Sequence, residues 1–134
     1  MKELKVEIVT PSKIAFDGNV KSITIPGTKG AFQVLFNHAP LMSSFEVGFL
    51  KIEDESGNST NYATSGGTVE VLNNKVIVLA ESFETKEEID LKRAEEAKDR
   101  AKKRIKKEST ERDVDFDRAE LALKRAINRI KLKK

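Results

Sequence analysis

The sequence predicts an α+β protein in which an antiparallel β-sandwich or flattened barrel, residues 1–84, precedes an antiparallel two-helix hairpin, residues 85–134. Short apolar or alternating runs recur at spacings of about ten residues in the first part, with turn residues between them. Glycine and proline are absent from residue 85 onward, where apolar residues recur every three or four positions. The net charge also changes, from −3 (seven lysines, ten acids) to +6 (18 basic residues, 12 acids).

The first part is predicted to consist of short strands. Leu4, Val6 and Ile8 alternate with charged residues, which is the period of a half-buried strand. Turn or breaker residues separate the runs that follow, at 10–11, 17–19, 26–30, 37–40, 56–58 and 66–67. We expect Gly66-Gly67 to form a bulge or tight bend. Alternating valines on both sides of Asn73-Asn74 predict a β-hairpin.

Two amphipathic helices are predicted after residue 84. The first helix could begin at Thr85, where Glu88 completes a capping box, or at Asp90 as N-cap, and we favour Asp90. The link 108–113 contains weak helix formers, with Asp113 and Asp115 as candidate N-caps of the second helix. The apolar stripes consist of Leu91, Ala94, Ala97, Ala101 and Ile105, then Phe116, Ala119, Leu123, Ala126, Ile127 and Ile130. Since alanines bury little area, such a seam is weak unless it packs on another surface.

All seven arginines follow residue 84, and five of them flank the apolar stripes on the same rotational side. These five are Arg93, Arg100, Arg118, Arg125 and Arg129. An antiparallel helix pair is related by a two-fold axis perpendicular to the plane of the helices, so matching flanks lie on one face. If the link centres near residue 111, Arg93 lies opposite Arg129 across the hairpin.

An arginine face of this kind has two interpretations. Guanidinium groups bind phosphate bidentately, and the start of a helix near Asp90 offers backbone donors, so the face could bind a polyanion. Alternatively, Glu96, Asp115 and solvent neutralise an ordinary charged surface, which is the commoner fate of a charge run. The spacing by itself leaves both interpretations open.

Several function classes are disfavoured. The chain has no cysteine, and His38, in a predicted loop, is its single histidine, so we expect no disulfide and no metal site. There is no nucleophile–base pair, so no catalytic residues are expected and the chain is predicted not to be an enzyme. A nucleic-acid-binding arm is disfavoured because acids are mixed with the bases and Phe116 is the only aromatic residue after Phe83. These absences, with no predicted signal peptide or membrane span, suggest an intracellular soluble protein.

The whole chain resembles the epsilon subunit of bacterial F-type ATP synthase. The matching segments are Val9-Thr10-Pro11, Pro26-Gly27-Thr28 with Gly30, Asn37-His38-Ala39-Pro40-Leu41, residues 65–71, IDLKRA at 89–94 and AELALKRAINR at 119–129. The resemblance implies a ten-stranded β-sandwich that binds the gamma subunit and the c-ring of the central stalk. It also implies a hairpin that extends along gamma to contact the beta and alpha subunits and to inhibit ATP hydrolysis. The expected location is the cytoplasmic face of the bacterial plasma membrane, reached only through the complex.

In some members of this family the pattern [IL]-D-x-x-R-A marks a site for ATP as a regulatory ligand. Ile89, Asp90, Arg93 and Ala94 match that pattern here. The resemblance extends the predicted ATP site to Glu84, Arg100, Arg125 and Arg129. ATP would then stabilise the compact hairpin by a shift of population. The alternative is the same stalk subunit with a mechanical and inhibitory role and no ATP binding.

Overall fold

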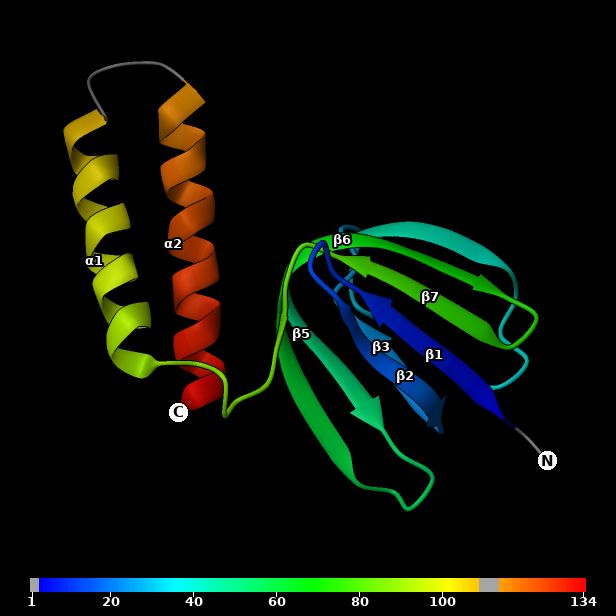
Figure 1. Ribbon diagram of the computed structural model, residues 1–134. Coiled ribbons are helices and arrows are strands. Elements are labelled where there is room, and N and C mark those ends of the chain that lie inside the picture. The colour runs from blue at the N-terminus through cyan, green and yellow to red at the C-terminus, as the bar shows by residue number, and fades with distance from the viewer. Residues whose placement is uncertain (1–2, 109–113) are drawn as a thin grey trace. The chain divides into compact units, whose positions relative to one another are not determined.

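The computed structural model describes residues 3–108 and 114–134 and divides the chain into two compact units, Met1–Thr85 and Lys86–Lys134 (Figure 1). The first unit consists of strands and the second of two helices. The strands are β1 (Leu4–Val9), β2 (Ile14–Val20), β3 (Ser22–Ile25), β4 (Phe32–Val34), β5 (Leu41–Glu53), β6 (Ser59–Leu72), β7 (Lys75–Ala80) and β8 (Phe83–Glu84). The helices are α1 (Leu91–Glu108) and α2 (Val114–Lys133). The predicted fold class is confirmed.

The strands form one open sheet in the order β2-β1-β7-β6-β5-β3-β4, with β8 paired to β6. A single core takes buried side chains from all eight strands, so the sheet must curve around it. Leu4, Val6 and Ile8 are fully buried, as their alternation predicted. One pairing differs from a purely antiparallel sandwich, because β1 and β7 run parallel. The strand pattern alone did not reveal this, since parallel and antiparallel partners bury alternate residues in the same way.

The described residues contain eight strands where the resemblance implied ten. The difference lies in β5 and β6, which have 13 and 14 residues and pair with each other over almost their whole length. Gly66 has φ 110°, and β6 bends there, so its first half pairs with β8 and its second half with β7. Counting each long strand as two segments on either side of the bend gives ten.

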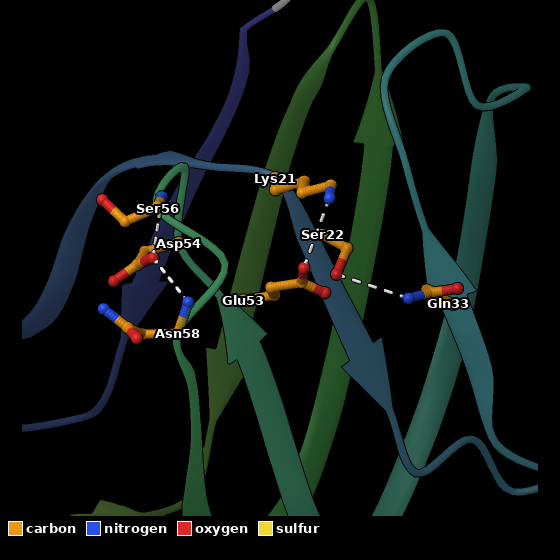
Figure 2. A network of polar contacts seen from close by, with 7 residues as sticks. All are labelled: Lys21, Ser22, Gln33, Glu53, Asp54, Ser56 and Asn58. Carbon is orange, nitrogen blue, oxygen red and sulfur yellow. Dashed lines mark hydrogen bonds and ion pairs between the residues drawn. The ribbon is translucent and has the colours of Figure 1, made fainter.

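The two predicted turns around β6 have the expected chemistry. Asn73 and Asn74 have φ angles of 49° and 61°, the left-handed conformation that a two-residue hairpin turn requires. Before β6, the Asp54 carboxylate accepts hydrogen bonds from the backbone N–H groups of Ser56 and Asn58, both at 2.9 Å (Figure 2). Such a side chain satisfies turn donors that would otherwise need water. These turns set the register of the long strands.

A second group of polar contacts lies beside that turn. Lys21 and Glu53 form an ion pair at 3.5 Å, and the Gln33 amide donates to the Ser22 hydroxyl at 3.3 Å (Figure 2). Ser22 is almost fully buried, so this hydrogen bond satisfies a polar group inside the sandwich. The Gln33–Ser22 bond joins β4 to β3, and the Lys21–Glu53 pair joins the residue before β3 to the end of β5.

The helical unit has the alanine seam that the spacing predicted. Ala94 and Ala101 of α1 and Ala119 and Ala126 of α2 are all buried. Phe116 belongs to the predicted stripe, but its side chain lies outside the described residues, as do those of the candidate caps Asp113 and Asp115. Neither helix, over the residues described, is apolar enough to cross a membrane.

Candidate functional site

The first helix begins where the sequence analysis favoured. The Asp90 carboxylate accepts a hydrogen bond from the Arg93 backbone N–H at 3.2 Å, and the Asp90 carbonyl accepts one from Ala94 N–H at 3.0 Å. Asp90 is therefore the N-cap of α1, and Thr85 is not. The preceding residue, Ile89, is buried and donates its N–H to the Lys86 carbonyl at 3.3 Å. Residues 86–89 thus form a closed turn, and the IDLKRA segment runs from the last residue of that turn into the first turn of the helix.

The level of each arginine along the hairpin follows from the helix bounds. Arg93 lies 15 residues before Glu108, where α1 ends, and Arg129 lies 15 residues after Val114, where α2 begins. Since the helices are antiparallel, these two arginines lie at the same level. Arg125 is four residues from Arg129, which is about 6 Å at 1.5 Å per residue.

The arginines also lie on one face of the hairpin. Each of Arg93, Arg100 and Arg125 precedes a buried seam alanine by one position, so each lies about 100° to the same side of the seam. Arg93 and Arg100 are exposed, whereas Arg125 and Arg129 are half-buried. With helix axes about 8–10 Å apart, guanidinium groups from both helices can contact one phosphate chain.

The alternative in which acids neutralise this face is only partly observed. Within the described part of the chain, no carboxylate lies within ion-pair distance of Arg93, Arg100 or Arg125, and Glu96 is exposed. Asp115, the other acid considered, has its side chain outside the described residues. Arg129 does have a polar partner. No described acid therefore neutralises three of the four arginines on this face.

Not every predicted site residue joins this face. Glu84 lies in β8 and belongs to the sandwich unit, whereas the other seven belong to the helical unit. Ile89 and Ala94 are buried, with 4% and 5% of their surface exposed, so they support the site more than they line it. The structure therefore groups Asp90 and four arginines on the hairpin and places Glu84 in a separate unit.

The sandwich carries a second candidate surface that sequence reasoning did not identify. A groove of about 400 Å³ lies across β5, β6 and β7, lined by Met42, Ser43, Ser44, Thr68, Val69, Glu70, Ile77 and Leu79. Met42 is 79% exposed and Leu79 53% exposed. Exposed apolar side chains gathered in one place are typical of a protein-binding surface. No local pattern in the sequence indicates this surface, because its residues come from three strands and lie together only through the pairing register of the sheet.

Comparison with known proteins identifies the family. Residues 3–86 match the family model described as the ATP synthase Delta/Epsilon chain beta-sandwich domain, and residues 87–134 match that of its long alpha-helix domain. The ATP synthase epsilon chain of Pelotomaculum thermopropionicum is 46% identical over 108 residues, which cover 81% of this chain and 80% of the relative. That of Salinibacter ruber is 41% identical over 111 residues, covering 77% of this chain and 74% of the relative. The chain belongs to the epsilon chain family of F-type ATP synthases.

The fold of this epsilon chain agrees with that assignment. A solved structure of the Euglena gracilis mitochondrial ATP synthase, comprising OSCP, F1 and c-ring, contains a similar chain with a TM-score of 0.78 at 24% identity. The similarity covers 92% of this chain and 77% of that chain. As an epsilon chain, the protein is a non-catalytic subunit of the synthase, as the resemblance implied.

Proposed function

We propose that this epsilon subunit couples the rotor to the catalytic head and that its helical hairpin is an ATP-sensitive brake on ATP hydrolysis. The ATP part of the proposal rests on the positions of four arginines, two from each helix. They lie on one face of the hairpin, and the helix bounds give their positions along it. An extended polyphosphate is the ligand that such a row fits, because each guanidinium can bind phosphate oxygens bidentately.

The roles of the other predicted residues follow from their positions. Asp90 already accepts the Arg93 N–H and retains lone pairs that can accept from an amino group of a base. Buried Ile89 and Ala94 hold the turn and the first helical turn in place. Glu84 belongs to the sandwich unit, so it is the one predicted site residue that the hairpin itself does not supply.

The thin seam makes the hairpin responsive to a ligand. Four buried alanines provide much less apolar area than leucines would, so the helix pair gains little from burial. Repulsion among Arg93, Arg100 and Arg125 opposes the compact form of the hairpin when no anion is present. ATP at 100 times its dissociation constant favours the state that binds it by about 2.7 kcal/mol, which is enough to reverse a balance of one or two kcal/mol.

The sandwich and the hairpin would bind different partners. We assign the sandwich to the gamma subunit and the c-ring, and the exposed apolar groove supports a protein-binding role for this unit. We assign the extended hairpin, with its net charge of +6, to acidic surfaces of the beta and alpha subunits. The complex would then sit at the cytoplasmic face of the bacterial plasma membrane, with this chain attached peripherally.

The test is a calorimetric titration of the full chain with ATP, beside Arg93→Ala and Arg125→Ala. The expected result is one-to-one binding that each substitution weakens at least about tenfold, because each removes a charge-assisted bidentate contact. Lys92→Ala and Lys124→Ala are matched controls, since each removes an exposed positive charge next to one of those arginines. No saturable binding at millimolar ATP would reject the sensor and leave the stalk subunit with a mechanical and inhibitory role alone.

The inhibitory role has a separate test. Removal of residues 85–134 from the assembled synthase should accelerate ATP hydrolysis at low ATP concentration. An unchanged hydrolysis rate would refute the brake, whether or not the isolated chain binds ATP.

A further inference from the structure

The Lys86 carbonyl accepts two hydrogen bonds that join the two ends of the helical unit. One comes from Ile89 N–H at 3.3 Å and closes the turn before α1. The other comes from the Lys133 ammonium group at 3.0 Å, from the last turn of α2 and 47 residues away in sequence. The same carbonyl therefore connects the start of α1 to the end of α2.

This contact lies at the end of the hairpin that the chain does not close. The helices are joined covalently through residues 109–113 at one end, and α1 starts and α2 stops at the other. Between them, the buried seam positions are alanines, which resist separation weakly. Separation of the helices from this open end must break the Lys133–Lys86 contact.

We propose that Lys133 and the Lys86 carbonyl form a clasp that keeps the open end of the hairpin closed and sets how readily the two helices separate. The C-terminal clasp, as we call this pair, is a regulatory contact built into the fold. Its consequence for the brake rests on the proposed function, but the clasp itself requires no ligand.

The neighbouring lysines show why Lys133 is the specific element. Lys131 and Lys134 are exposed, whereas Lys133 is half-buried and bonded to the connector. All three favour the C-terminal end of the α2 dipole, so general electrostatics do not distinguish them. Only Lys133 adds a bond to the other end of the unit.

The clasp lies close to the proposed ATP site. Lys133 is four residues, or one helical turn, beyond Arg129, and Lys86 precedes the Asp90 cap by the same number of residues. A closed clasp orders the turn and the last turn of α2, both of which ATP would otherwise have to order on binding. The clasp and ATP should therefore stabilise each other reciprocally.

Hydrogen exchange of the full chain without ATP tests the clasp directly. Lys133→Met keeps most of the side-chain length and removes the donor, and Lys131→Met is the matched control for the loss of charge. We expect the amides of Ile89 and Ala94 to exchange about 3- to 10-fold faster in Lys133→Met and at the original rate in Lys131→Met. Circular dichroism at 222 nm establishes that both variants retain their helices.

Equal exchange in the two variants would overturn the clasp. An ATP titration of the same variants separates this outcome from failure of the proposed function. Faster exchange in Lys133→Met with no ATP binding to any form supports the clasp and rejects the ATP sensor. ATP binding to every form, with equal exchange in both variants, keeps the sensor and rejects the clasp.

Discussion

Phe83 fixes the last strand before the hairpin to the core of the sandwich, and its replacement by alanine is predicted to destabilise that unit severely. The Phe83 side chain is 8% exposed and stacks on Tyr62, with ring centroids 4.4 Å apart and planes inclined by 22°. Its strand, β8, pairs with β6 through Glu84 opposite Ala63 and Phe83 opposite Thr64. The aromatic side chain is therefore the main apolar contact of this segment.

The magnitude follows from the burial. Truncation of a buried phenylalanine to alanine costs about 3–5 kcal/mol, and loss of an aromatic pair accounts for about 0.5–1.5 kcal/mol of this. We expect about 3 kcal/mol for Phe83→Ala, at the lower end, because a two-residue strand can move to fill part of the cavity. Small domains have a total stability of about 5–15 kcal/mol, so this is a large fraction.

Urea unfolding followed by tyrosine fluorescence measures this loss. Tyr62 is the only tyrosine in a chain without tryptophan, so the signal reports the sandwich unit alone. With a slope of about 1–3 kcal/mol per molar urea, the midpoint should fall by roughly 1–3 M. Ile14→Ala is the control, because Ile14 is 64% exposed and its loss should cost less than about 0.5 kcal/mol. A midpoint for Phe83→Ala equal to that of Ile14→Ala would refute the anchoring role.

Two further substitutions test local features of each unit. Asp90→Ala should reduce the stability of the hairpin by about 0.5–2 kcal/mol in thermal unfolding at 222 nm, whereas Asp90→Asn, which keeps the capping oxygen, should restore most of it. Equal melting of these two variants would contradict the cap. Gly67→Ala should destabilise the sandwich by about 1–3 kcal/mol in urea, since its new Cβ would lie 2.0 Å from the Leu79 carbonyl oxygen. Gly18→Ala, whose Cβ meets only the Phe16 ring at 3.8 Å, should stay within about 1 kcal/mol of the unsubstituted protein, and a comparable loss in both would count against the steric argument.

Local chemistry determined much of this protein before any tertiary contact was considered. The alternation of Leu4, Val6 and Ile8 identified the buried face of β1, and the Asn73-Asn74 pair identified the turn between β6 and β7, because both depend on neighbouring residues. The same holds for the Asp90 cap, where a carboxylate reaches a backbone N–H three residues later. The flank of the arginines followed from the helical period, and their level depended only on where the link is centred.

The resemblance over the whole chain added the family, which the comparisons confirmed, and the ATP site, which stays a prediction. Periodicity places Arg93 and Arg125 on a face, but it does not say what that face binds. ATP was inferred as the ligand from the short pattern IDLKRA. Because no described acid lies beside Arg93, Arg100 or Arg125, that face is available to an anionic ligand.

Other features were decided only by the tertiary structure. The parallel pairing of β1 with β7, the stacking of Tyr62 on Phe83 and the bond from Lys133 to Lys86 each join segments far apart in the sequence. The groove under Met42 and Leu79 exists only because the register of three strands brings their outer faces together. Periodicity specifies which side of a helix or strand is apolar. Which other segment that side contacts depends on how the chain packs around its core, and no local pattern encodes that choice.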